Sequence, residues 1–216
     1  MGGMPQHLAS TPDIPSSAMA HAHAALLTPY LNTAAGMQAL QLRRGDVELL
    51  RAVAPTGLGC WTRLDLARGR WSGAVRAEVN ALPFADESVG LVVAEHVLEA
   101  LAQPGPLLAE IARVLQPGGR LLLCSYSRWH PRGWGACRRT RRAGADCHLR
   151  GVFAQMRSVR ALGLERESIE RQSGCVLLVL RKRRASALIL HLPRGRLASF
   201  RGPMGTIPGG THREAS

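Results

Sequence analysis

The sequence predicts an α/β domain built around a mostly parallel sheet. Short apolar runs alternate with helical patterns as far as residue 125, which is the order expected of strand–helix–strand units. The run Leu121-Leu122-Leu123 is continuously apolar, as strands buried on both faces are. Further on, Gln172-Ser173-Gly174 separates two strand-like segments and predicts a hairpin, which should give the sheet an antiparallel edge. Open sheets of this kind bind ligands beyond the carboxyl ends of their strands.

Each expected element has a local signal of its own. Alternation of polar and apolar side chains indicates a strand at 61–66, and an unbroken apolar run indicates one at 89–94. The helix at 106–115 is the clearest, because Pro106 suits a first helical turn and Pro117-Gly118-Gly119 stops it. The expected strands are 37–42, 61–66, 89–94, 120–125, 164–171 and 175–182. The helical patterns cover 46–54, 95–102, 106–115 and 152–159.

Composition sets the limits of the domain. Of the 216 residues, 46% are hydrophobic, which is enough for a sizeable core. Proline and small polar residues predict a flexible leader over 1–25, and Gly and Pro predict a disordered tail over 193–216, so the folded domain should span 26–192. No apolar run reaches the roughly 18 residues of a spanning helix, and no secretory signal is evident, so we expect a cytoplasmic protein.

Charge is distributed unevenly along the chain. There are 28 Lys and Arg residues against 15 Asp and Glu, a net charge of +13. Residues 1–127 carry 9 basic and 10 acidic groups (net −1), whereas residues 128–216 carry 19 basic and 5 acidic groups (net +14). This asymmetry predicts binding of polyanions such as RNA, with Trp129, Trp134 and Phe153 as stacking groups. The alternative is an arginine-rich composition that only solvates the surface.

The five cysteines predict no metal site. Structural zinc ligands usually come in pairs two to four residues apart, and the chain has no such pair among its cysteines. The odd count and the cytoplasmic expectation favour reduced thiols. The cysteines are Cys60, Cys124, Cys137, Cys147 and Cys175.

Three motifs stand close together in the segment 81–119. They are Leu82-Pro83-Phe84 followed by Ala85-Asp86-Glu87-Ser88, then Val89-Gly90-Leu91-Val92-Val93 leading into His96-Val97-Leu98-Glu99, and Arg113-Val114-Leu115-Gln116-Pro117-Gly118-Gly119. Together they resemble class I S-adenosylmethionine-dependent methyltransferases of type 11, in particular a bacterial branch with a degenerate glycine motif. The resemblance implies a shortened Rossmann-like seven-stranded sheet with an antiparallel last strand. It also implies S-adenosylmethionine as the cofactor and methyl transfer to an unidentified acceptor.

The resemblance places a cofactor loop directly after the first strand. There, Leu42, Arg43 and Gly45 stand where the family has alternating glycines, which let the backbone approach the ligand because they lack Cβ. Arg43 replaces the first of those glycines, so we expect cofactor binding to be weak or conditional. Gly57-Leu58-Gly59 is an alternative loop, although a strand rather than a helix follows it.

Two acids are candidates for holding the nucleoside. Asp65, near the end of the second strand and 22 residues after Arg43, would accept hydrogen bonds from both ribose hydroxyls. By resemblance, Glu78 would accept a bond from the adenine amino group, and the backbone N–H of Val79 would contact the ring. Each acid is equally well interpreted as a solvated surface residue.

The strand at 89–94 should deliver Glu95 and His96 to the rim of the pocket. His96 is the candidate catalytic base, because imidazole titrates near neutral pH; the alternative is that it shapes the pocket. Gly90 replaces an Asp that is common in the family, and so removes a carboxylate that would brace the site.

Three functions remain open on the sequence. The first is methyl transfer from S-adenosylmethionine to a small molecule or a nucleic acid. The second is a methyltransferase-like binding or scaffold protein without catalysis, which the lost glycines and Gly90 favour. The third is RNA binding through the basic segment 128–160.

Overall fold

The structure is a computed structural model that describes residues 17–34, 36–44, 59–142, 144–149, 157 and 159–184, with the backbone alone over 17–23. The predicted helix at 46–54, most of the predicted helix at 152–159 and the whole predicted tail at 193–216 lie outside these residues. Gly45, Gly57 and Leu58 also lie outside them.

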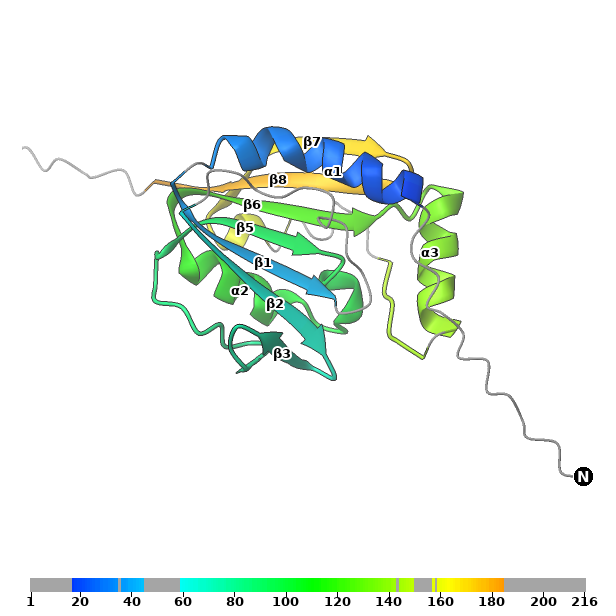
Figure 1. Cartoon of the computed structure of the whole chain (residues 1–216), viewed down its shortest axis with the longest axis horizontal. Coiled ribbons are helices and arrows are strands. Elements are labelled where there is room, and N and C mark those ends of the chain that lie inside the picture. Colours follow the sequence, from blue (N-terminus) through cyan, green and yellow to red (C-terminus); the bar gives the residue numbers. More distant parts are fainter. Residues whose placement is uncertain are drawn as a thin grey trace, which may run out of the picture. The chain divides into compact units, whose positions relative to one another are not determined.

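One sheet of eight strands organises the described residues, in the order β4-β3-β2-β1-β5-β6-β8-β7 (Figure 1). Neighbours β2, β1, β5 and β6 are parallel, whereas β8 runs antiparallel to both β6 and β7. The four parallel strands therefore end at the same edge. The strands are β1 (Gln38–Arg44), β2 (Cys60–Ala67), β3 (Arg70–Gly73), β4 (Ala77–Glu78), β5 (Val89–Glu95), β6 (Leu115–Tyr126), β7 (Leu164–Gln172) and β8 (Cys175–Lys182).

The two faces of the sheet are covered by different helices. Helix α1 (Ser17–Asn32) places Leu27 and Leu31 in one cluster with side chains of β1, β5, β6 and β8. Helix α2 (Gly105–Val114) packs its apolar side chains into a larger cluster on the opposite face (Figure 1). A third helix, α3 (Pro131–Arg142), follows the end of β6. In the described part of the chain, no helix combines the length and apolarity that crossing a membrane requires.

The predicted fold class is confirmed, and every predicted strand overlaps an observed one. The predicted place of residues 175–182 at the edge of the sheet is wrong, because β8 lies between β6 and β7. Its six residues from Cys175 to Leu180 are all buried, whereas β7 is mostly exposed or half-buried and forms the edge. The short hairpin of β3 and β4 was not predicted; it adds two strands to the six predicted by residue range, so the sheet has eight strands among the described residues rather than the seven that the resemblance implied.

Three predicted boundaries also differ. Pro117-Gly118-Gly119, predicted to be a turn, is an irregularity within β6, where Val89 pairs with Leu115 but Leu91 pairs with Arg120. The helix predicted at 95–102 is only a short 3₁₀ helix, η2 (Leu98–Ala100). Helix α1 begins at Ser17, so the predicted boundary at residue 25 falls inside a helix.

Candidate functional site

The carboxyl ends of the parallel strands bring charged residues into one row. Asp65 on β2 is in register with Arg43 on β1, and Arg43 is in register with Glu95 on β5. Glu95 is in turn in register with Cys124 on β6. Three residues predicted for the cofactor site are therefore brought together at the edge where open sheets bind ligands.

Asp65 is ion-paired with Arg43, the residue that stands in place of the first glycine. The guanidinium of Arg43 donates from Nε to Oδ1 and from Nη2 to Oδ2 of Asp65, the second bond measuring 3.2 Å. The pair is partly buried, with side-chain exposures of 13% for Arg43 and 27% for Asp65. Both oxygens of the Asp65 carboxylate are therefore engaged by Arg43.

Glu95 lies deeper than the sequence predicted. It is fully buried rather than at a pocket rim, and its Oε1 accepts a bond of 2.7 Å from Nε2 of Gln41. The amide oxygen of Gln41 accepts bonds from Nε of Arg63 and Nε1 of Trp61. Glu95 thus belongs to a polar network across three strands, which makes it a residue that shapes the site.

His96 also lies in the interior, directly after β5. Its ring is fully buried and stacks on Tyr126, with ring centroids 3.8 Å apart. Its Nδ1 lies 3.3 Å from Oε1 of Glu99. The backbone of His96 has a left-handed φ of 52°, a conformation that costs on the order of 1–3 kcal/mol and is concentrated at functional sites.

Glu99 is a residue of this cluster that the sequence analysis missed. Besides contacting His96, its Oε1 accepts a bond of 2.6 Å from the backbone N–H of Tyr126, which joins η2 to the end of β6. Its other oxygen, Oε2, and the hydroxyl of Ser125 are buried without a hydrogen-bond partner among the described residues. The signal was its spacing of only three residues from His96, which keeps the two side chains within reach of each other.

The residues predicted to hold adenine lie on the short outer strand. Glu78, on β4, pairs with Arg70 on β3 at 2.8 Å, and both side chains are more than half exposed. The carbonyl of Val79 accepts a bond of 3.3 Å from Nε1 of the buried Trp71. An exposed ion pair of this kind contributes about 0–1 kcal/mol, so Glu78 is easily released to a ligand.

Two glycine interpretations change with the structure. Gly59 precedes β2 and donates to the carbonyl of Met37, at the amino ends of the strands. Gly59, the one described residue of the alternative loop at 57–59, therefore lies at the edge opposite the carboxyl ends of the parallel strands. Gly90 also lies near the amino end of β5, where a Cβ would come within 2.5 Å of Nε2 of Gln116. Its role is close packing, and the site has not lost a brace through it.

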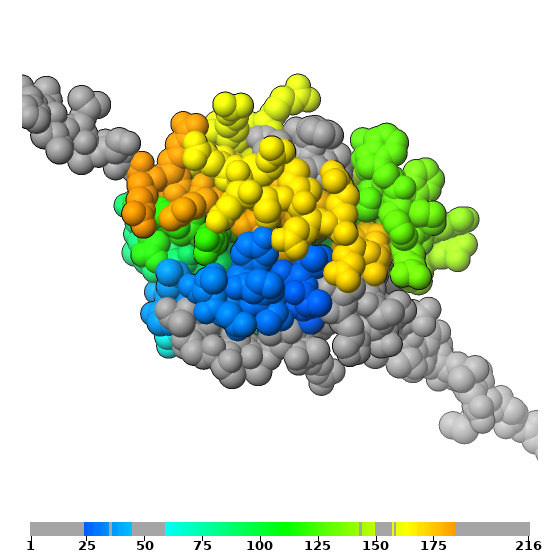
Figure 2. Space-filling view, turned by 90° about the horizontal axis from the view of Figure 1, so that it is seen from above, coloured from blue at the N-terminus to red at the C-terminus, as the bar shows by residue number. Residues whose placement is uncertain are grey.

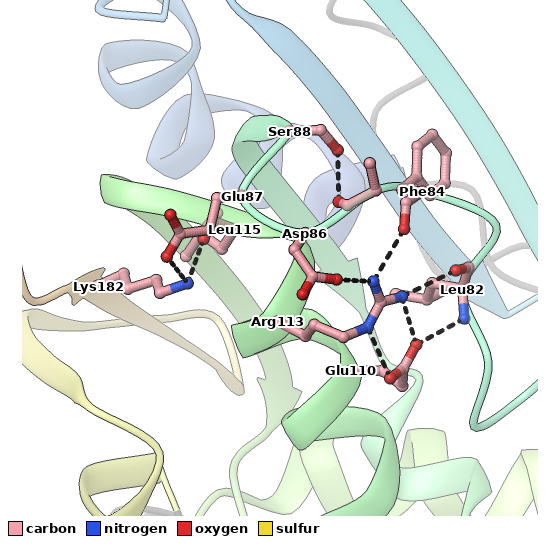
Figure 3. Close-up of polar contacts among 10 residues, drawn as sticks. Leu82, Phe84, Asp86, Glu87, Ser88, Glu110, Arg113, Leu115 and Lys182 are labelled. Carbon is pink, nitrogen blue, oxygen red and sulfur yellow. Dashed lines mark hydrogen bonds and ion pairs between the residues drawn. The ribbon is translucent and has the colours of Figure 1, made fainter.

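The motif residues at 82–86 and 110–113 form a clamp rather than a binding site. Arg113, on α2, donates to the carboxylates of Glu110 and Asp86 and to the carbonyls of Leu82 and Phe84 (Figure 3). Glu110 also accepts from the backbone N–H of Leu82 at 2.9 Å. The hydrogen bonds from Arg113 lower the pKa of Glu110. This clamp fixes the segment that leads into β5.

The cysteines offer no thiolate at the carboxyl edge. Burial raises the pKa values of Cys124 and Cys175, so both are protonated at neutral pH. Cys137 and Cys147 form a disulfide, which corrects the expectation that all thiols are reduced. Among the described residues, no group of three or more Asp, Glu, His or Cys side chains is placed to hold a metal ion.

Comparison with known proteins relates part of the chain to methyltransferases. The type 11 methyltransferase domain family matches residues 60–123, from β2 to the middle of β6. This stretch, less than a third of the chain, is therefore similar to a type 11 methyltransferase domain. An uncharacterized methyltransferase of Mycobacterium tuberculosis is 38% identical over 95 residues, which are 44% of this chain and 35% of that protein. One from Mycolicibacterium vanbaalenii is 49% identical over 55 residues, which are 26% of this chain and 21% of that protein.

The matches therefore span about a fifth to a third of these relatives' lengths.

Solved structures support the fold over a longer stretch of the chain. A SAM-dependent methyltransferase from Aquifex aeolicus superposes with a TM-score of 0.55 at 13% identity, covering 77% of this chain and 93% of the other. The YcgJ protein from Bacillus subtilis does so with a TM-score of 0.52 at 15% identity, covering 74% of this chain and 98% of the other.

Proposed function

We propose that this protein is an S-adenosylmethionine-dependent methyltransferase whose cofactor site opens when Arg43 leaves Asp65. The observation that carries the proposal is the Arg43–Asp65 pair at the carboxyl edge of a type 11 methyltransferase domain. The cofactor, when bound, supplies a methyl group already activated on a sulfonium, so the protein has only to position the acceptor and remove a proton.

The nucleoside would be held by residues on three strands. Once released from Arg43, Asp65 accepts from the ribose hydroxyls. Glu78 and the backbone of Val79 recognise adenine. Leu42 and Arg43, at the end of β1, together with Gly45, which follows in the sequence, would line the approach to the amino-acid part of the cofactor.

The acceptor side is formed by the residues after β5. Glu95, fixed by Gln41, shapes the wall of the site. We assign His96 as the base that takes the acceptor proton, with Glu99 holding its Nδ1 side. Since His96 is fully buried, proton transfer requires the same opening of the site that cofactor binding requires.

The experiment is calorimetry with S-adenosylhomocysteine on the wild type and on Arg43→Gly. We expect a wild-type Kd weaker than about 1 μM. Removing the guanidinium frees Asp65, so Arg43→Gly should bind roughly tenfold more tightly, which corresponds to about 1.4 kcal/mol for opening the pair. Arg68→Gly is the matched control: Arg68 is exposed, has a left-handed φ of 51° that glycine tolerates, and loses the same charge.

Two outcomes would contradict the proposal. A submicromolar wild-type Kd would show that Arg43 does not obstruct the site. Equal affinity of Arg43→Gly and Asp65→Ala/Arg43→Gly would place the ribose elsewhere.

A second candidate is a methyltransferase-like binding protein without catalysis. The Arg43–Asp65 pair favours it as well, because it neutralises the carboxylate that the cofactor needs. Absence of S-adenosylhomocysteine binding in Arg43→Gly, with the fold retained, would favour this function over methyl transfer.

Partners and location complete the proposal. Residues 128–216 carry a net +14, which supports binding of polyanions, including a nucleic-acid acceptor. We place the protein in the cytoplasm, where the free Cys60, Cys124 and Cys175 would stay reduced. The Cys137–Cys147 disulfide is the observation against this location, and mass spectrometry of alkylated protein from cells would decide it.

A further inference from the structure

A groove of about 870 Å³ runs along α3, beyond the end of β6. It begins two residues after Tyr126, the residue that stacks on His96. Figure 2 shows the α3 segment in green, standing out from the neighbouring surface. The groove is thus a separate surface that adjoins the carboxyl edge of the sheet. The lining residues that matter here are Arg128, Trp129, Trp134, Arg138, Arg141 and Arg142.

Two indole rings of the groove are exposed and held in place. The exposed fractions are 84% for Trp129 and 63% for Trp134, whereas that of Trp71 in the core is 1%. Nε1 of Trp134 donates to the carbonyl of Arg128, and the guanidinium of Arg128 lies 4.9 Å from the ring centroid of Trp129. Exposed indoles that are fixed by such contacts are ready-made stacking platforms.

The arginines of the groove are not neutralised. Trp134, Arg138, Arg141 and Arg142 share one side of α3 through spacings of three and four residues. In the part of the chain that the structure describes, no arginine of α3 forms an ion pair with a carboxylate. Guanidinium groups without carboxylate partners are suited to binding phosphates.

A lipid surface fits α3 less well than a nucleic acid does, because the apolar side of α3 faces the protein. Its small side chains Gly133, Ala136, Cys137 and Thr140 are already buried in the protein. Among the described residues, the large hydrophobic side chains exposed on or near α3 are the two tryptophans. A helix lying in a membrane interface buries a broad apolar face, whereas Trp134 is the one large hydrophobic side chain that α3 exposes.

We infer that the α3 groove binds single-stranded nucleic acid, with bases stacked on Trp129 and Trp134 and phosphates on Arg138, Arg141 and Arg142. The volume suits one or two nucleotides, and the combination of aromatic platforms with cationic groups is the one used for single strands. The inference extends the proposed polyanion binding to a named site and ligand. The inference does not rest on methyl transfer, so the nucleic-acid site and the proposed methyltransferase activity can each be disproved without the other.

The first test measures fluorescence anisotropy of a labelled 12-mer of deoxythymidine with the full chain. Trp129→Ala keeps every charge and alters a side chain that is 84% exposed, so it should fold normally. We expect it to weaken binding roughly five- to 150-fold, the range for losing one stacked base. Unchanged affinity in both Trp129→Ala and Trp134→Ala would overturn the inference.

The second test separates the groove from the general charge of α3. The double variant Arg138→Ala/Arg141→Ala removes two groove arginines, and Arg132→Ala/Arg139→Ala removes two from the same helix that do not line the groove. We expect only the first to reduce the slope of log affinity against log salt by about 1.4. Equal losses in both double variants would mean that binding is diffuse.

The third test compares ligands. Polyphosphate of matched charge should bind more weakly than the 12-mer, because it has no bases to stack. Vesicles containing anionic lipid should not compete with the 12-mer for the groove. Polyphosphate binding as tight as the oligonucleotide, or displacement of the oligonucleotide by vesicles, would overturn the assignment.

Discussion

The arginines of the sheet and those of α3 have opposite surroundings. In and around the sheet, Arg43, Arg113 and Arg120 each contact a carboxylate, and their guanidinium groups hold separate segments together. On α3, five arginines lie within twelve residues, and no carboxylate among the described residues pairs with them. The same residue type therefore stabilises structure in one region and presents charge for a ligand in the other.

The two regions also differ in how they are held in place. The clamp around Arg113 joins α2 to the segment before β5 by polar contacts (Figure 3), beside the packing of Leu82 and Phe84 in the same apolar cluster as α2. α3 instead packs through small side chains, and the Cys137–Cys147 disulfide ties it to the segment that follows. Charge in α3 is thus free for function because charge is not needed to fix the helix.

Removing one arginine from each region gives the largest expected contrast. Arg113→Ala leaves Glu110 and two carbonyls without their donor, so we expect the free energy of unfolding to fall by about 2–4 kcal/mol. Arg139→Ala, on the exposed side of α3, should change it by less than about 0.5 kcal/mol. Urea unfolding measures both, and similar losses in the two variants would break the comparison.

Two glycines of α3 test how that helix is fixed. A Cβ on Gly133 would stand 2.3 Å from the carbonyl oxygen of Ser127, so Gly133→Ala should cost about 1–3 kcal/mol through overpacking. A Cβ on Gly135 would meet only a side-chain nitrogen of Arg139 at 3.5 Å. Gly135→Ala should therefore raise stability by roughly 0.5–1 kcal/mol, as Ala does in a helix interior. Thermal unfolding should show a lower melting temperature for Gly133→Ala and a higher one for Gly135→Ala. A lower melting temperature in both variants would mean that α3 tolerates no added side chain on either side.

The smallest expected effect concerns the pH dependence of the clamp. Arg113 lowers the pKa of Glu110 below its ordinary value of 4.5, so the stabilisation is fully present above that value. It is lost as the pH falls through the lowered pKa of the folded protein. Glu110→Gln should therefore be less stable than the wild type near pH 7, by less than about 1 kcal/mol for a partly exposed pair.

The difference between the wild type and Glu110→Gln should shrink as the pH is lowered below 4.5 and disappear once the pH is below the lowered pKa of Glu110. Melting temperatures of both proteins across this range measure it. A difference that persists unchanged at pH 3 would show that the carboxylate charge contributes nothing to the clamp.

Local pattern predicted the elements of the sheet well, because each signal lies within a few residues. The apolar runs at 89–94 and 121–123 could only be buried strands, and they became β5 and the centre of β6. Pro106 and the following glycines bounded α2 within one residue. The place of β8 between β6 and β7 could not be read in this way, because strand order depends on pairing between segments that are distant in sequence.

Sequence reasoning identified Asp65 and Arg43 as site residues but assigned them separately to the ligand. That they bind each other follows from the parallel register of β1 and β2, which places them opposite one another although 22 residues separate them. Likewise, four of the partners of Arg113 come from two segments that only the packing of α2 brings together.

The sequence by itself determined the resemblance to type 11 methyltransferases, the parallel sheet and the excess of charge from residue 128 onward, because motif spacing, apolar periodicity and composition are properties of the chain. Only the tertiary structure decided which arginines are neutralised. An ion pair depends on where the carboxylate lies in space. The sheet places Asp65 beside Arg43, and α2 with the segment before β5 places Glu110 and Asp86 beside Arg113, whereas no described acid pairs with the arginines of α3.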